Sequence, residues 1–140
     1  MSHLPLDARD LEERLQEVAL RVREIRGLLL VDSDGLPLVS TLGARGLEDS
    51  LGAFTGAIQA LLERARQDFQ MGPLHLLRLA GRDRQVFVAP VTRGLFLLGV
   101  AETGATPSTI EAHLVALARS VLESVLEGLV RPPGAETTEA

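Results

Sequence analysis

The chain has no cysteine, tryptophan, tyrosine, lysine or asparagine among its 140 residues. Without cysteine, disulfide bonds and thiolate chemistry are excluded, and a zinc site is disfavoured. Without lysine, the phosphate-binding motif GxxxxGK[ST] is absent. The aromatic residues are four phenylalanines, so the chain lacks the stacking platforms that bind single-stranded nucleic acids.

The charge and the apolar runs exclude two further classes of partner. The net charge is −5 and the acidic and basic residues are interspersed, whereas a nucleic-acid surface needs a basic face. No apolar run approaches the ~20 residues of a membrane helix. The first residues, MSHLPLDARD, lack the basic and apolar regions of a signal peptide. We therefore expect a cytoplasmic protein that has no nucleic-acid partner and does not insert into a membrane.

The length fits one domain, which at this size buries about 68–70% of the surface of its unfolded chain. No repeat or linker divides the sequence. We expect a single domain over residues 7–130, a loose N-terminus at 1–6 and a disordered tail at 131–140, because RPPGAETTEA has little to bury.

Apolar spacing and turn residues predict three helices and five strands. The expected order is helix 8–25, strands 28–32 and 36–41, helix 47–70, strands 74–79, 85–91 and 95–101, and a last helix that begins at Pro107 or Ser108 and ends near Gly128. Asp34-Gly35 predicts a two-residue hairpin with positive φ at both positions. Pro37 removes a backbone donor, which favours an edge strand.

The last three strands do not alternate cleanly between apolar and polar residues. Adjacent apolar pairs occur at Leu76-Leu77, Val86-Phe87 and Phe96-Leu97. An antiparallel sheet with one face in water would alternate. The sheet is therefore expected to carry helices on both faces.

The middle helix, residues 47–69, has two faces that both look buried. One is an apolar stripe of Leu47, Leu51, Phe54, Ile58, Leu61, Ala65 and Phe69, widened by Leu62. The other consists of small residues, Gly52, Ala53, Gly56, Ala57 and Ala60. Small residues let a second backbone approach closely. This face is either crowded by loops of the same chain or is a docking surface for a second subunit or another protein.

The order of elements and the stretch LLLVDSDGLPLVS after the first helix resemble the roadblock family of dynein light chains and its bacterial relatives. Further matching features are the small-faced helix, VFVAPV at 86–91 and LFLLGV at 95–100. The resemblance covers about residues 8–128. The bacterial relatives include gliding-motility regulators that act on small Ras-like GTPases.

The resemblance implies a fold, a dimer and a partner. The fold is an α/β (α+β) sandwich whose five-stranded antiparallel sheet has the strand order 2-1-5-4-3, roadblock- and profilin-like, with one helix on one face and both terminal helices on the other. The strand 74–79 then pairs with its twin in a homodimer. The expected dimer or partner interface is Gly52, Ala53, Gly56, Ala57, Ala60, Arg64, Leu74, Leu76 and Arg78.

A search for chemistry finds no catalytic, cofactor-binding or metal-binding site. His3, His75 and His113 are scattered without metal-ligand spacing. The stretch 32–35 begins like a calcium loop, but Gly43 stands where the bidentate glutamate is needed. The sequence thus predicts a non-enzymatic homodimer that binds a small Ras-like GTPase and modulates its nucleotide state. The alternatives are an adaptor dimer without effect on hydrolysis, and a small-molecule sensor domain with a pocket of ~300 Å³ or more.

Overall fold

The computed structural model describes residues 7–43 and 45–130 of the chain. The loose N-terminus and the tail expected from the sequence lie outside these residues. The elements, in chain order, are α1 (Ala8–Arg21), β1 (Ile25–Asp32), β2 (Pro37–Ser40), α2 (Arg45–Asp68), β3 (Leu77–Ala80), β4 (Arg84–Thr92), β5 (Leu95–Glu102) and α3 (Pro107–Val130).

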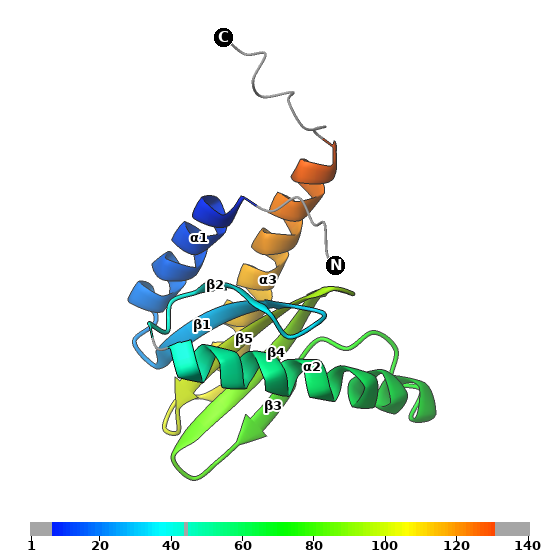
Figure 1. Cartoon of the computed structure of the whole chain (residues 1–140). Coiled ribbons are helices and arrows are strands. Elements are labelled where there is room, and N and C mark those ends of the chain that lie inside the picture. Colours follow the sequence, from blue (N-terminus) through cyan, green and yellow to red (C-terminus); the bar gives the residue numbers. More distant parts are fainter. Residues whose placement is uncertain (1–6, 44, 131–140) are drawn as a thin grey trace.

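The five strands form one antiparallel sheet in the order β2-β1-β5-β4-β3. Helices α1 and α3 lie on one face of this sheet and α2 crosses the other face (Figure 1). The strand order and the three-layer arrangement expected from the sequence are confirmed.

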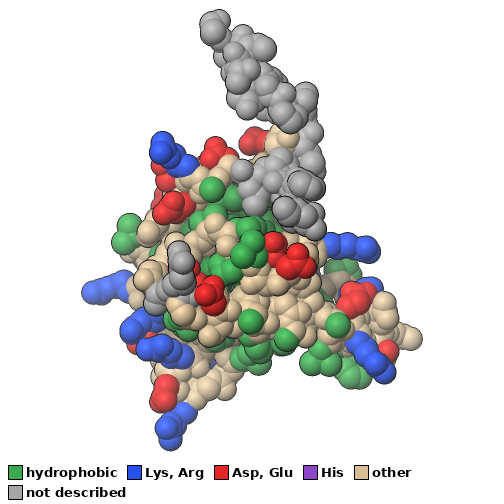
Figure 2. Space-filling view, in the orientation of Figure 1, with side chains coloured by type: hydrophobic (Ala, Val, Ile, Leu, Met, Phe, Trp, Pro, Cys, Tyr) green, Lys and Arg blue, Asp and Glu red, His purple; other side chains and the backbone are tan. Residues whose placement is uncertain are grey.

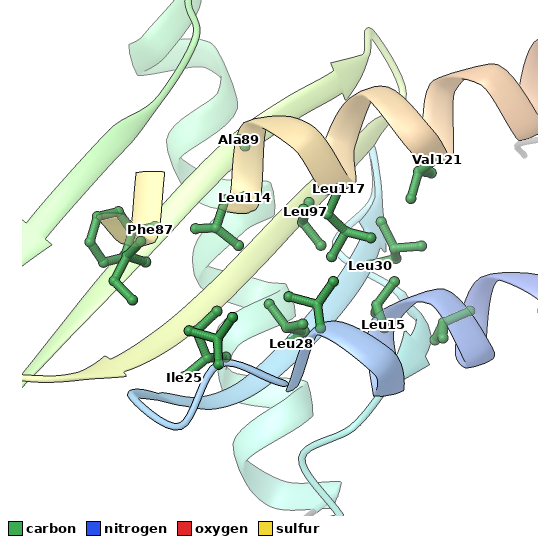
Figure 3. Packing of buried hydrophobic residues seen from close by; sticks show 14 of the residues in the cluster. Leu15, Ile25, Leu28, Leu30, Phe87, Ala89, Leu97, Leu114, Leu117 and Val121 are labelled. Atoms are coloured by element: carbon green, nitrogen blue, oxygen red, sulfur yellow. The ribbon is translucent and has the colours of Figure 1, made fainter. Parts of the chain in front are cut away.

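The larger core lies between the sheet and the pair α1 and α3 (Figure 3). Leu15 of α1, Leu114 and Val121 of α3, and Leu28 and Leu97 of the sheet are at most 1% exposed in this layer. The apolar spacing of both terminal helices therefore points at one shared core, which fixes them against the central strands.

The smaller core lies under α2. Its buried members are Leu29, Val31, Val88, Phe96 and Leu98 of the sheet, and Leu51, Phe54 and Ile58 of α2 pack against them. Each central strand thus contributes apolar side chains to both faces, which explains why its sequence does not alternate.

Helix α1 begins where the sequence places it and ends earlier. The side chain of Asp7 accepts a hydrogen bond from the backbone N–H of Asp10 (3.2 Å), which caps the first turn. The helix was expected to continue to Ile25, but Ile25 pairs with Ala101 at the start of β1. Ile25 is apolar and buried in either arrangement, so helical spacing alone does not distinguish them.

The β1–β2 hairpin has a longer connection than the sequence predicts. The N–H of Gly35 donates to the carbonyl of Asp32 (3.0 Å) and the N–H of Asp32 donates to the carbonyl of Leu36 (3.1 Å). Only Gly35 has positive φ in this turn, at 84°, so the expectation of positive φ at Asp34 is wrong. The geometry is that of a three-residue hairpin loop, Ser33 to Gly35, whose last residue is a glycine in the left-handed region.

The buried carboxylate of Asp32 holds this turn together. Its Oδ1 accepts hydrogen bonds from the backbone N–H groups of Asp34 (2.8 Å) and Leu36 (2.9 Å). A carboxylate that satisfies two backbone donors in this way is a structural feature of the turn.

One further strand boundary differs from the sequence-based expectation, and one helix boundary agrees with it. Strand β3 begins at Leu77, and the expected strand residues 74–76 lie in the loop before it. Helix α3 starts at Pro107, the earlier of the two expected starts, since proline already has the φ of a first helical residue.

Candidate docking surface on α2 and β3

The glycines of α2 pack against the chain's own hairpin turn. Gly52 is buried, and a Cβ atom placed on Gly35 would lie 2.6 Å from the Gly52 carbonyl oxygen. A Cβ atom on Gly56 would lie 3.5 Å from the carbonyl oxygen of Asp34. The Gln59 side chain adds a hydrogen bond to the carbonyl of Ser33 (3.0 Å). Gly52 therefore faces the chain's own turn and has no room for another molecule beside it, whereas Gly56 is half-buried next to the turn.

The alanines of the small face remain on the surface. Ala53, Ala57, Ala60 and Arg64 are exposed. They form an outward strip of α2 that no other part of the described chain covers.

Leu61 joins this outward strip, contrary to the expectation that it packs on the sheet. Its side chain is 67% exposed. The apolar stripe of α2 turns inward at Leu51, Phe54 and Ile58 only, because the second half of the helix projects past the strands (Figure 1). Phe69, at the far end of the stripe, is 73% exposed for the same reason.

The end of α2 is stabilised by local polar contacts. The N–H of Met71 donates to the carbonyl of Arg66 (3.1 Å), and Gln70 has a φ of 54°, as in a helix end closed by a left-handed residue. Arg66 donates side-chain hydrogen bonds to Glu63 and thereby lowers the pKa of that carboxyl. Arg64 pairs with Asp68 (3.4 Å). The side chains of Phe69 and Met71, which follow the last turn of α2, take no part in these polar contacts and are exposed.

Strand β3 presents an apolar side chain beside α2. Leu77 packs into the core under α2, whereas Leu79 on the same face of the strand is 41% exposed. Its cross-strand neighbour Val86 is half-buried. The sheet thus extends further than α2 covers it.

The other expected site residues near β3 occupy three different positions. Leu74 is half-buried in the loop before the strand, and Leu76 packs against the core of α1 and α3. Arg78 lies on the α3 side of the strand, where its Nε donates to Oε1 of the buried Gln85 (2.7 Å). Leu76 therefore lies on the opposite face of the sheet from the exposed strip of α2.

The two edges of the sheet differ in how well they are protected. Strand β2 contains Pro37 and a register shift where it pairs with β1 at Leu30 and Val31. Proline and a bulge both hinder the addition of another strand. Strand β3 pairs with β4 in an unbroken register and contains no proline. The β3 edge is thus the open edge of the sheet.

We define the α2–β3 surface as Ala53, Ala57, Ala60, Leu61, Arg64 and Leu79. Hydrophobic side chains gather beside the second half of α2 in the space-filling view (Figure 2). The sequence reasoning missed Leu61 and Leu79 as surface residues. The length of α2 is the sequence signal that could have indicated this exposure. A helix of 24 residues spans about 36 Å and extends beyond the sheet that it covers.

Nothing in the described residues suggests a metal centre or a membrane span. Residues 7–43 and 45–130 contain no group of three or more metal-ligating side chains. Within the same ranges, none of the helices has the length and apolar character needed to cross a membrane. A groove of about 300 Å³ lies open at the surface beside β2 and is lined by Glu12 and Glu48 among others.

The fold is similar to that of several solved structures. The MglB protein of Myxococcus xanthus superposes with a TM-score of 0.78 at 12% identity, over 91% of this chain and 95% of that one. The gliding protein mglB of Thermus thermophilus gives a TM-score of 0.73 at 18% identity over the same shares. Acanthamoeba castellanii profilin II gives 0.56 at 12% identity, covering 81% of this chain and 97% of profilin. At these identities the likeness establishes a roadblock- and profilin-like fold.

Two further comparisons concern the family itself. A Roadblock/LC7 domain from Streptomyces avermitilis superposes with a TM-score of 0.75 at 18% identity, over 82% of this chain and 97% of that one. A comparison with the sequences of curated proteins finds no match. The sequence profile of the Roadblock/LC7 domain matches residues 11–101, well over half of the chain. The chain belongs to the Roadblock/LC7 family.

Proposed function

We propose that this chain is a cytoplasmic, non-enzymatic regulatory homodimer that binds a small Ras-like GTPase and modulates its nucleotide state. The α2–β3 surface supports the proposal most directly, because it joins exposed apolar residues to an open sheet edge. Membership of the Roadblock/LC7 family and the likeness to the MglB proteins support it further.

The dimer uses the part of the surface where the sheet lies open. Leu79 on β3 and Leu61 on α2 are both exposed apolar side chains. An exposed, unprotected strand edge invites pairing with another strand. A second copy that pairs with β3 brings its own α2 to the same side of the joined sheet, so that two α2 helices line one surface.

The GTPase docks on the outward alanine strip of these helices. Ala53, Ala57 and Ala60 allow a close approach of a partner's backbone, and exposed Arg64 lies at the end of the strip. Arginine is well suited to pair with carboxylate groups of a partner. We assign the strip a binding role, and no step of GTP hydrolysis is assigned to this chain.

The two alternative functions differ from this one in a measurable way. An adaptor dimer binds its partners with unchanged GTP hydrolysis and nucleotide release. A small-molecule sensor needs a site that encloses its ligand. The groove beside β2 is open at the surface, and apolar side chains fill the layers on both sides of the sheet, so the regulatory dimer is favoured.

The test is a titration of the chain with a small Ras-like GTPase from the same genome, loaded in turn with GDP and with a GTP analogue. We expect the two nucleotide states to bind with different affinities, and GTP hydrolysis or nucleotide release to change on binding. Binding with both rates unchanged supports the adaptor. Absence of binding in both states contradicts the proposal.

A matched pair of variants places the binding on α2. Ala60→Arg introduces a long charged side chain into the strip, and we expect the affinity for the GTPase to fall at least about tenfold. Ala116→Arg is the control, because Ala116 is an exposed alanine of α3 on the opposite face of the sheet. Equal loss in both variants would contradict the assignment of the strip.

A further inference from the structure

One end of the sheet carries a cluster of exposed arginines. At this end α1 finishes, β1 and β4 begin, and β3 and β5 finish, as the cross-strand pairs Ile25–Ala101 and Arg84–Glu102 show. Basic side chains gather there, over the end of α1 and the β3–β4 hairpin, at the left and lower left of the space-filling view (Figure 2). We define the arginine end as the exposed residues Arg21, Arg23, Arg26, Arg82 and Arg84.

Contacts of Glu102 join the parts of the arginine end. The backbone N–H of Glu102 donates to the carbonyl of Glu24, in the turn between α1 and β1 (2.9 Å). Its carboxylate accepts a hydrogen bond from Nη1 of Arg26 (2.8 Å). Arg84 stands directly opposite Glu102 in the β4–β5 ladder. Two arginines thus lie on either side of one carboxylate, on three neighbouring strands.

Most of the arginines at this end have no carboxylate partner within the described residues. Arg21, Arg23 and Arg84 form no salt bridge with residues 7–43 and 45–130. Arg82 lies 3.5 Å from the carboxylate of Asp83, but the two side chains are 93% and 82% exposed. A pair exposed to this degree contributes little. These guanidinium groups are therefore available to another molecule.

The positive charge of the arginine end is separated from an acidic remainder. Its five arginines share segments 21–26, 82–84 and residue 102 with three acidic residues, Glu24, Asp83 and Glu102. Elsewhere in the chain, nine arginines are accompanied by sixteen acidic residues. An anionic partner is thus attracted to this end and repelled by the remainder of the chain.

The three carboxylates of the arginine end decide which kind of anion fits it. Nucleic acids and anionic lipid surfaces are continuous arrays of phosphates, which would lie against these carboxylates as well as against the arginines. Clusters that bind anionic lipids contain about four to eight basic residues, whereas five arginines and three carboxylates leave an excess of two positive charges here. A protein segment has separated carboxylates, and its N–H groups and polar side chains can donate to Glu24, Asp83 and Glu102.

We propose that the arginine end is a docking surface for an acidic segment of another protein. The free guanidinium groups bind carboxylates of the segment, a pairing for which the planar guanidinium is well suited. Leu20, which is 80% exposed and directly precedes Arg21, adds apolar surface beside them. The arginine end shares no residue with the α2–β3 surface, so the docking is independent of the homodimer and of the GTPase.

The probe is a fluorescent peptide with glutamate at every third position and serine and glycine between, titrated by anisotropy. We expect saturable binding at low ionic strength that weakens as salt is added, because salt screens exposed charges. The same peptide with glutamine in place of glutamate should not bind. Equal binding of the glutamine peptide, or no binding of the glutamate peptide at low ionic strength, overturns the proposal.

Two competitors test the choice of a protein segment. Duplex DNA and phosphatidylserine vesicles are added to the bound peptide at the same concentration of anionic groups as the peptide supplies. We expect most of the peptide to stay bound. Its displacement by DNA or by vesicles at this concentration overturns the choice in favour of that competitor.

A matched pair of double variants locates the binding. Arg82→Gln with Arg84→Gln removes two charges from the arginine end and should weaken the affinity for the glutamate peptide at least about fivefold. Arg9→Gln with Arg119→Gln is the control, because it removes the same charge from exposed positions of α1 and α3, and it should change the affinity less than about twofold. All four side chains are exposed, so both variants keep the fold. Equal losses in the two variants overturn the assignment to the arginine end.

Discussion

Gly52 of α2 and Gly35 of the β1–β2 turn are in backbone contact, and a Cβ atom on either glycine would overlap the carbonyl group of the other. This contact sets the distance between α2 and the hairpin. It also accounts for a glycine inside a helix, where glycine costs about 1 kcal/mol relative to alanine.

The first prediction concerns this contact. Gly52→Ala should lower the free energy of unfolding by about 1–3 kcal/mol, because neither backbone can retreat without moving α2. Gly46→Ala is the control, since nothing lies within 4 Å of a Cβ atom there, and it should be neutral or stabilising by up to about 1 kcal/mol. Urea unfolding measures both variants. Equal stability of the two would contradict the tight contact.

The second prediction concerns the Asp32 carboxylate. Asp32→Ala leaves the backbone N–H groups of Asp34 and Leu36 without their acceptor, and should cost about 1–3 kcal/mol of stability. Asp32→Asn keeps one side-chain oxygen and should recover most of the loss. Thermal unfolding of both variants provides the measurement. Asp32→Asn as unstable as Asp32→Ala would show that the charge is needed as well as the oxygen.

The third prediction concerns the end of α2. Gln70 has a positive φ, which costs a residue with a side chain roughly 1–2 kcal/mol relative to glycine. Gln70→Gly should therefore raise the free energy of unfolding by about 0.5–1 kcal/mol, the gain being reduced by the greater freedom of the unfolded chain. Gln67→Gly, one turn earlier in α2, should have the opposite sign. Denaturant titration distinguishes a rise from a fall.

The fourth prediction concerns dimerisation through Leu61. Leu61→Arg places a charge on the α2–β3 surface and should raise the dissociation constant of the homodimer at least about tenfold. Leu20→Arg on α1 is the control, because Leu20 is 80% exposed on the opposite layer, and it should leave the constant unchanged. Sedimentation over a range of concentrations measures both. A similar shift in both variants would indicate a nonspecific charge effect.

The fifth prediction concerns Glu63. Hydrogen bonds from Arg66 lower the pKa of the Glu63 carboxyl, so the pair adds stability above the unfolded pKa of that group and loses it as the pH falls through the lower, folded pKa. The effect on stability is small because both groups are exposed. An NMR titration should show the lowered pKa of Glu63, and Arg66→Gln should return it toward the ordinary value. An unchanged titration curve in Arg66→Gln would show that another group causes the shift.

The sheet and its layers could be predicted from the sequence because the signals are redundant. Pro37 indicates an edge strand, and Asp34-Gly35 indicates a turn. The adjacent apolar pairs of β4 and β5 indicate a sheet with helices on both faces. The strand order itself is implied by the resemblance to the roadblock family, so errors of a few residues at Ile25 or Leu74 leave it intact.

The division of α2 into inner and outer residues could not be predicted in the same way. A small residue leaves room for either a turn of the same chain or a partner molecule. The sequence does not show which of the two lies beside Gly52 and which beside Ala53. Whether Leu61 points toward the sheet or toward solvent depends on how far the sheet extends under α2. The spacing of apolar residues along a helix does not give that extent.

The contrast between the two sheet edges determines how large an assembly β3 pairing produces. Each copy has one open edge, and pairing through β3 consumes the open edge of both copies. The outer margins of the joined sheet are then two β2 strands, each carrying Pro37 and a shifted register. In the homodimer that we propose, growth by strand addition would therefore stop at two copies, and the same pairing would prevent polymerisation into a fibre.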